Sequence, residues 1–234
     1  MNLTKFGKRI KEESNKQQAK SLKWFFKTGV GEYGEGDVFA GIKMPVQRKI
    51  AKEFKNLDYD NIKELVGSKI HEERMIGFLI LQGKYEKGNE KEKEKIFKFY
   101  IRNRKGINNW DLVDISAPKI IGEHLLNRDK KLLYQFAHSK NLWERRIAIL
   151  STFTFIRAEK FEPTFKISDI LLDDDHDLIH KAVGWMLREI GKRDLNAEEK
   201  LLKPRYKKMP RTMLRYAIEK FSEVKRKKYL SSKI

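Results

Sequence analysis

Two short segments place a tryptophan and a charged side chain on one face of a predicted helix. In NNWDLVD, Trp110 and Asp114 are four residues apart, and in KAVGWMLREI, Trp185 precedes Arg188 by three residues. Side chains at these spacings lie over one another on a helix surface. An aromatic face next to a carboxylate or a guanidinium can bind a charged or polarised group, so both segments are candidates for chemistry.

The segment NLWERRIAIL adds Trp143 and Arg146 at the same three-residue spacing. Each candidate alone also has an ordinary structural interpretation. A lone tryptophan usually packs in the core, and Asp114 early in a helix can act as a cap or as a partner of the helix dipole. Arg145 and Arg146 can form a solvated face or a salt bridge with Glu144. Only the combination of these residues favours a functional site.

Together, two tryptophan faces, one carboxylate and one guanidinium suit the cleavage of an N-glycosidic bond in DNA. That reaction passes through an oxocarbenium-like state in which positive charge develops on the sugar. A carboxylate stabilises this charge and positions water, tryptophan faces attract polarised C–H edges, and arginine grips a flanking phosphate. These effects grow stronger where water is excluded.

The composition is that of a basic, folded protein. The chain has 234 residues, with 52 Lys and Arg against 33 Asp and Glu, and its formal net charge is +19. This excess should attract a polyanion, most simply nucleic acid, although an acidic membrane surface or the ribosome would meet the same requirement. The chain has no cysteine, which excludes disulfides, thiolate metal sites and cysteine nucleophiles. The N-terminal segment lacks an uninterrupted apolar stretch, so we expect a cytoplasmic protein without a secretory signal or membrane span.

Apolar residues recur three and four positions apart along most of the chain, which predicts roughly a dozen helices of about 10–18 residues. The helices come in pairs, and the segments around Arg74, Asp114, Arg146, Trp185 and Arg215 recur roughly every 30 to 40 residues. This period is typical of HEAT-like helical hairpins. We therefore predict an all-α protein, an α-α superhelix (solenoid) of such hairpins, with residues 1–234 forming a single domain. Its concave basic surface could wrap a duplex.

In the helix around Trp185, the predicted buried stripe is Val183, Met186, Leu187 and Ile190, which leaves Trp185 on another face.

Two features interrupt the helical pattern. The glycine-rich segment 28–37, TGVGEYGEGD, matches G-x-G-x-x-G, but a helix precedes it and no βαβ unit surrounds it. A flexible connector between helices is therefore the better interpretation. Pro118 cannot donate a hydrogen bond to the carbonyl of Asp114, so we expect a kink or a helix start beside that aspartate.

A metal site is not expected. His176 and His180 are four residues apart among several aspartates, which superficially resembles a zinc-protease helix. However, Asp177 stands in the glutamate's position of that motif and no third ligand is apparent. An acidic loop that caps the next helix explains the segment better.

Several segments together resemble the AlkD-type DNA alkylation repair glycosylases. They are NNWDLVDISAPKIIGEHL, NLWERRIAIL and KAVGWMLREIGKRD, with FAGIKMPVQRKIAKEF and MPRTMLRYAIEKF nearer the two ends. The resemblance covers residues 20–222. The W-D-x-V-D and G-W-x-L-R-E motifs are fairly specific when they occur in this order.

This resemblance implies a HEAT-like solenoid that removes cationic alkylated purines, such as 3-methyladenine and 7-methylguanine, from duplex DNA. It further implies that no cofactor is needed and that the damaged base is not rotated into a pocket. By this correspondence Asp114 is the catalytic carboxylate, Trp110 and Trp185 contact the sugar, and Arg146 is the essential arginine. Arg188 matches a position that contacts the DNA backbone.

This sequence departs from the family's best-known member at Lys43, where that protein has glutamine, and in a longer glycine-rich loop. Both differences concern the contacts of the N-terminal repeats, and hence the lesion range. Clustered basic residues usually just keep a surface solvated, but as a set they could neutralise phosphates. The further DNA-binding candidates are Lys43, Arg48, Arg104, Lys105, Arg145, Arg211 and Arg215.

Two other functions remain open at this point. A HEAT-repeat scaffold that binds damaged or structured duplex without catalysis would have the same fold, charge and salt dependence. A solenoid that binds acidic proteins would not need the Trp–Asp and Trp–Arg pairs. A monomer is expected in either DNA-binding case.

Overall fold

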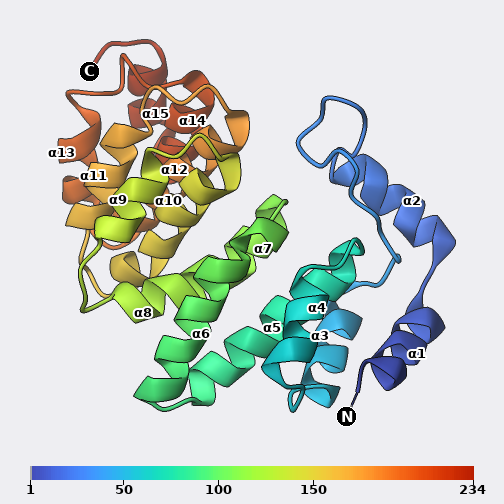
Figure 1. Cartoon of the computed structure of the whole chain (residues 1–234). Helices are drawn as coiled ribbons and strands as arrows, with labels where there is room; N and C mark the ends of the chain where they lie inside the picture. Colours follow the sequence, from blue (N-terminus) through green and yellow to red (C-terminus); the bar gives the residue numbers. More distant parts are fainter. Residues whose placement is uncertain (1) are drawn as a thin grey trace. The chain divides into compact units, whose positions relative to one another are not determined.

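A computed structural model of the chain describes residues 2–234 (Figure 1). The described residues are helical throughout and contain no strand, apart from an isolated bridge between Val38 and Ile70. The all-α prediction is confirmed, although several helices are shorter than predicted. The α-helices are α1 (Leu3–Glu13), α2 (Lys16–Phe25), α3 (Met44–Glu53), α4 (Tyr59–Val66), α5 (His71–Lys87), α6 (Glu90–Asn103), α7 (Trp110–Ser116), α8 (Glu123–Leu125), α9 (Lys131–Ala137), α10 (Leu142–Arg157), α11 (Glu162–Ile170), α12 (Asp177–Gly191), α13 (Leu195–Leu202), α14 (Arg211–Ala217) and α15 (Glu223–Leu230). None of these helices is long and apolar enough to cross a membrane.

The chain divides into two compact units, Met1–Ser116 and Ala117–Ile234. In the first unit, α5 is the central helix and packs against α3, α4, α6 and α7. From Met75 to Leu81 every residue of α5 is buried, which is typical of a helix surrounded by others. The Tyr100 hydroxyl of α6 lies 3.0 Å from the Ser116 hydroxyl of α7 and joins these two helices.

In the second unit, α12 packs between α10 and α14, while α9 packs against α11. Helical hairpins therefore stack in this unit, as the paired periodicity predicts. The predicted stripe of Val183, Met186, Leu187 and Ile190 is buried in α12. Close packing against α14 requires Gly184, because a Cβ at this position would lie 2.4 Å from the Met213 carbonyl oxygen.

The glycine-rich segment connects α2 to α3, as predicted. Gly31 and Gly36 have φ values of 76° and 79°, a left-handed conformation that glycine adopts without strain. The segment then turns inward and buries Asp37 and Phe39 in the first unit. It is therefore part of the core as well as a connector.

The predicted distortion at Pro118 takes the form of a π-helix, Ala117–Gly122, which follows α7 directly. Proline lacks the N–H that would continue the α-helical hydrogen bonds, so the helix widens beside it. In the second unit, the Thr154 hydroxyl donates a 2.7 Å hydrogen bond to the Pro118 carbonyl, which anchors this segment to α10.

Candidate functional site

The short helix α7 carries two of the residues predicted to be catalytic. Trp110 is its first residue and Asp114 lies one turn later, and both side chains are half-buried. Asn109 immediately before the helix is fully buried, and its side-chain oxygen accepts a 2.9 Å hydrogen bond from the Trp110 N–H. The start of α7 is thus held by the protein interior, whereas the Trp110–Asp114 face remains partly accessible.

An aromatic cluster surrounds the Trp110 ring. Its centroid lies 5.9 Å from that of Phe25 and 5.2 Å from that of Phe26. Phe26 in turn stacks on Phe39 at 5.2 Å, and Phe39 stacks on the His71 ring at 4.6 Å. These contacts give Trp110 a rigid support from α2 and the glycine-rich segment.

His71 is held between two carboxylates. Its Nδ1 lies 2.9 Å from Asp37 Oδ2, and its Nε2 lies 2.9 Å from Asp111 Oδ2 on α7. Since a carboxylate can only accept a hydrogen bond, both ring nitrogens act as donors and the imidazole is positively charged. Burial alone would lower the pKa of His71, but the hydrogen bonds to Asp111 and Asp37 outweigh it and raise the pKa to about 9.

Arg74, one helical turn after His71, completes this buried network. Its Nη2 donates to Asp37 Oδ1 at 2.5 Å and to Asn108 Oδ1 at 2.8 Å, and its Nη1 donates to the Ser68 carbonyl. Burial would raise the pKa of Asp37, but the hydrogen bond from His71 and the charge of Arg74 lower it below its usual value. The network therefore ties the glycine-rich segment and the chain preceding α7 to the start of α5.

Sequence reasoning missed this network. The available signal was a histidine and an arginine three residues apart at the start of an otherwise apolar helix, since ionisable groups on a buried helix need partners. Asp37 sat in a segment interpreted only as a connector, and Asp111 was overshadowed by Asp114.

In the second unit, the structure places Arg146 and Trp185 on the neighbouring helices α10 and α12. Arg146 is buried, and its Nη1 donates a 2.6 Å hydrogen bond to the Leu178 carbonyl at the start of α12. Trp185 is half-buried, with its centroid 6.0 Å from that of Phe153 on α10 and its Nε1–H donating to Glu189 Oε1 at 3.2 Å. Both predicted residues thus belong to the same α10–α12 layer.

Two of the arginines predicted to bind DNA take part in ion pairs within the second unit. Arg145 donates to Asp174 at 2.6 Å, which is the salt-bridge alternative considered for this residue, although its partner is not Glu144. Arg188 pairs with Glu219. A phosphate would have to share or replace these carboxylates.

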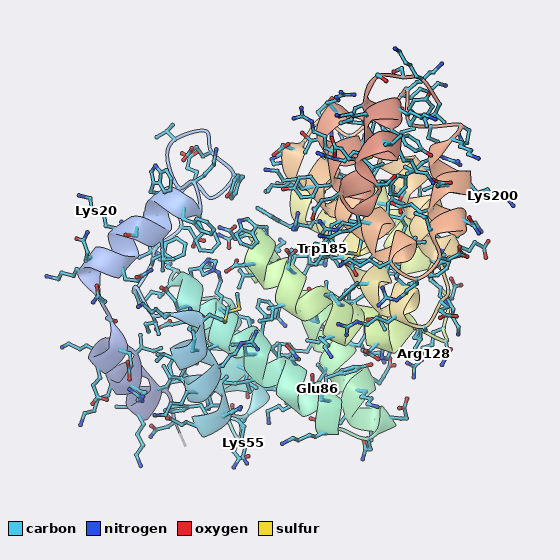
Figure 2. The ribbon with its side chains drawn as sticks, turned by 180° about the vertical axis from the view of Figure 1, so that it is seen from behind. Lys20, Lys55, Glu86, Arg128, Trp185 and Lys200 are labelled. Atoms are coloured by element: carbon cyan, nitrogen blue, oxygen red, sulfur yellow. The ribbon has the colours of Figure 1, made fainter. Side chains whose placement is uncertain are left out.

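The other basic candidates differ in their exposure. The Arg104 side chain is half-buried and donates to the Ile101 carbonyl at 2.8 Å. Exposed lysines such as Lys20, Lys55 and Lys200 extend away from the ribbon in Figure 2. The exposed candidates are Lys43, Arg48, Lys105, Arg211 and Arg215.

His176 and His180 have structural partners. His176 precedes α12 and its Nδ1 accepts a hydrogen bond from the Leu178 N–H at 3.1 Å, while His180 bonds to the Asp174 carbonyl. Within residues 2–234, no group of three or more histidine, aspartate or glutamate side chains is arranged to hold a metal ion.

Comparisons with known proteins agree on one family. The family model described as DNA alkylation repair enzyme matches residues 7–221. The structure is similar to that of a predicted DNA alkylation repair enzyme from Enterococcus faecalis, with a TM-score of 0.70 and 17% sequence identity over 90% of this chain and 98% of that chain. No curated protein sequence matches the chain.

Proposed function

The chain belongs to the DNA alkylation repair enzyme family, and from this premise we propose that it is a DNA glycosylase. Its proposed substrates are cationic alkylated purines, 3-methyladenine and 7-methylguanine, in duplex DNA, and it acts as a monomer. The observation that carries the proposal is the pairing of Trp110 with Asp114 on one accessible face of α7, supported from behind by buried aromatic rings.

The proposed reaction needs little acid catalysis, because a cationic base is already a good leaving group. The base departs with the electron pair of the glycosidic bond, and positive charge develops on the sugar. The Asp114 carboxylate stabilises this charge and positions the water whose oxygen bonds to the sugar carbon as a proton is released. Trp110 and Trp185 supply ring faces for the polarised sugar edges.

Arg146 has the phosphate-contacting role in this proposal. Only 5% of its surface is exposed and its Nη1 is bonded to the Leu178 carbonyl, so one edge of the guanidinium at most faces DNA. A guanidinium held in this way loses little side-chain entropy when it binds a phosphate oxygen.

His71 is a positioning residue in the same proposal. It contacts no substrate, but its hydrogen bond to Asp111 anchors the residue between Trp110 and the rest of α7. A loss of this bond should loosen the start of the helix and displace the Trp110–Asp114 face by a small distance. Small displacements of reacting groups lower the rate of a chemical step strongly.

The test is the release of 3-methyladenine and 7-methylguanine from methylated duplex DNA. Asp114→Asn should lower the rate by about 10²- to 10³-fold, the usual effect of removing one charge-stabilising group, and should leave duplex affinity nearly unchanged. Asp173→Asn is the matched control, because this aspartate is exposed in the loop before α12. Equal loss of release and binding in Asp114→Asn would refute the assigned role. No release by the wild type, with salt-sensitive binding intact, would favour a non-catalytic DNA-binding scaffold.

A further inference from the structure

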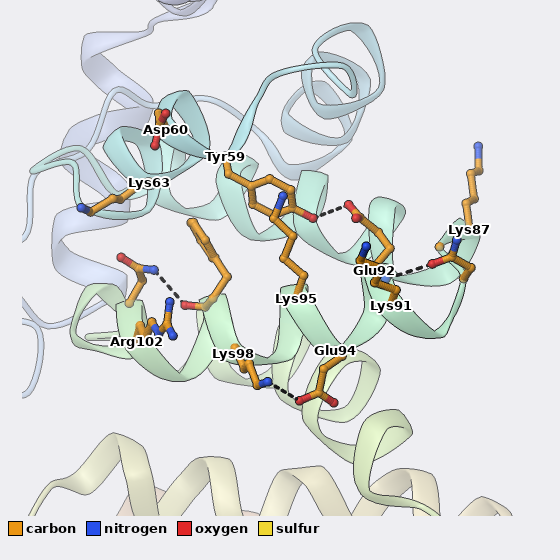
Figure 3. A pocket seen from close by; sticks show the side chains of 14 residues that line it. Tyr59, Asp60, Lys63, Lys87, Lys91, Glu92, Glu94, Lys95, Lys98 and Arg102 are labelled. Atoms are coloured by element: carbon orange, nitrogen blue, oxygen red, sulfur yellow. Dashed lines mark hydrogen bonds and ion pairs between the residues drawn. The ribbon is translucent and has the colours of Figure 1, made fainter.

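A basic groove lies in the first unit, between the start of α4, the end of α5 and one side of α6. Figure 3 shows it from close by, with α6 forming one wall. The groove has a volume of about 1120 Å³, and three of its residues are acidic: Asp60, Glu92 and Glu94. Its six cationic side chains are Lys63, Lys87, Lys91, Lys95, Lys98 and Arg102.

Two of the three carboxylates are already engaged. The Tyr59 hydroxyl donates a hydrogen bond to Glu92, and Lys98 pairs with Glu94 at 3.1 Å. Lys95 lies over the Tyr59 ring, 4.0 Å from its centroid (Figure 3). These contacts organise the floor of the groove but neutralise few of its charges.

The other four cations, Lys63, Lys87, Lys91 and Arg102, form no ion pair within residues 2–234. All four side chains are exposed. On other helices of this chain, exposed lysines have carboxylate partners one turn away, as in Lys166–Glu162 at 2.7 Å. The groove therefore concentrates positive charge that the protein itself does not balance.

The shape of this charged surface indicates the form of its partner. Lys91, Lys95, Lys98 and Arg102 recur at three- and four-residue spacing along one side of α6. Their 11-residue span corresponds to about 16 Å of helix, which is about five phosphates of one DNA strand along the duplex axis. A flat membrane surface would not enter a groove, whereas a linear polyanion fits along it.

The groove faces away from α7. Ile96 and Tyr100, on the other side of α6, are fully buried, and Tyr100 contacts Ser116 of α7. A duplex whose lesion lies against Trp110 and Asp114 would therefore contact a different side of this unit. Anion binding in the groove requires another stretch of nucleic acid.

We propose that this groove binds the phosphate backbone of a second DNA segment, so that one protein molecule can hold two duplexes. The charge is delocalised over lysines and offers no hydrogen-bonding pattern for bases, so binding should be independent of sequence and strongly dependent on salt.

The experiment uses two undamaged duplexes. The protein is first saturated with an immobilised duplex, and capture of a second, fluorescent duplex is then measured across salt concentrations. The test variant is Lys63→Gln/Lys91→Gln/Arg102→Gln, which leaves the Tyr59–Glu92 and Lys98–Glu94 contacts in place. The control, Lys5→Gln/Lys8→Gln/Lys11→Gln, removes equal charge from the exposed side of α1.

The wild type and the control should capture the second duplex. The groove variant should lose capture at least about tenfold, and its salt dependence should fall by up to about three phosphate contacts, each contributing about 0.9 to the slope. Equal capture by all three proteins, or equal loss in both variants, would overturn the proposal. Displacement of the second duplex by polyglutamate at a lower charge concentration than by DNA would also overturn it, in favour of an acidic protein partner.

Because capture is measured on undamaged DNA, the result does not depend on glycosylase activity. Release of methylated bases from one short duplex should be the same in the groove variant and the wild type.

Discussion

Replacing His71 by glutamine should remove the cation that joins Asp37 to Asp111, and the effect on stability should depend on pH. The pKa of His71 in the folded protein is about 9, against 6.5 for an ordinary histidine. A raised pKa means that the folded state binds the proton more tightly than the unfolded state. The resulting stabilisation is fully present below about pH 6.5 and is lost as the pH rises through about 9.

The size of the effect follows from the shift of the pKa. Each pKa unit corresponds to about 1.4 kcal/mol, so the shift from 6.5 to about 9 represents about 3 kcal/mol of unfolding free energy. His71→Gln should therefore be destabilised by about 3 kcal/mol near pH 6, and the difference from the wild type should shrink toward zero above about pH 9.

Urea unfolding between about pH 6 and pH 10 measures this difference. The control is His138→Gln, because His138 is exposed in the second unit. Glu198, whose pKa is also raised, makes stability fall with rising pH in this range, but it does so in every variant, so the difference between proteins isolates His71. A difference between wild type and His71→Gln that stays constant with pH would refute the reasoning. In Asp111→Asn, which keeps only the Asp37 partner, the loss of stability should begin at a lower pH than in the wild type.

Two further predictions concern the second unit. Burial and the charge of Glu199 raise the pKa of Glu198 to about 9, so the folded state resists its ionisation; Glu198→Gln should stabilise the protein by about 3 kcal/mol at pH 7 and flatten the decline of stability between about pH 4.5 and pH 9. Urea unfolding at several pH values tests this, and unchanged pH dependence would contradict it. Gly184→Ala should lower stability by about 1–3 kcal/mol, because its Cβ would overlap the Met213 carbonyl and the Tyr216 side chain. Gly83→Ala on α5, with open space around its Cβ, should instead raise stability by about 0.5–1 kcal/mol in the same assay, and equal effects at both glycines would argue against the packing explanation.

The sequence by itself determined the helical class, the buried stripe of α12 and the distortion at Pro118. Each of these depends on interactions within a few residues. Helical periodicity places Val183, Met186, Leu187 and Ile190 on one face whatever they pack against. A proline removes a backbone donor wherever it stands. The same local geometry placed Trp110 and Asp114 together, one turn apart.

Only the tertiary structure decided the partners of the charged residues. His71 meets Asp37 and Asp111, which are 34 and 40 positions away in the chain. Arg188, predicted to face DNA, meets Glu219, 31 positions away. No periodicity specifies such pairs, because in this chain of 85 charged residues many pairings are equally compatible with the sequence. The packing of α7 on α5, and of the glycine-rich segment beside them, selects His71, Asp37 and Asp111, since a charge that loses its water must gain a partner.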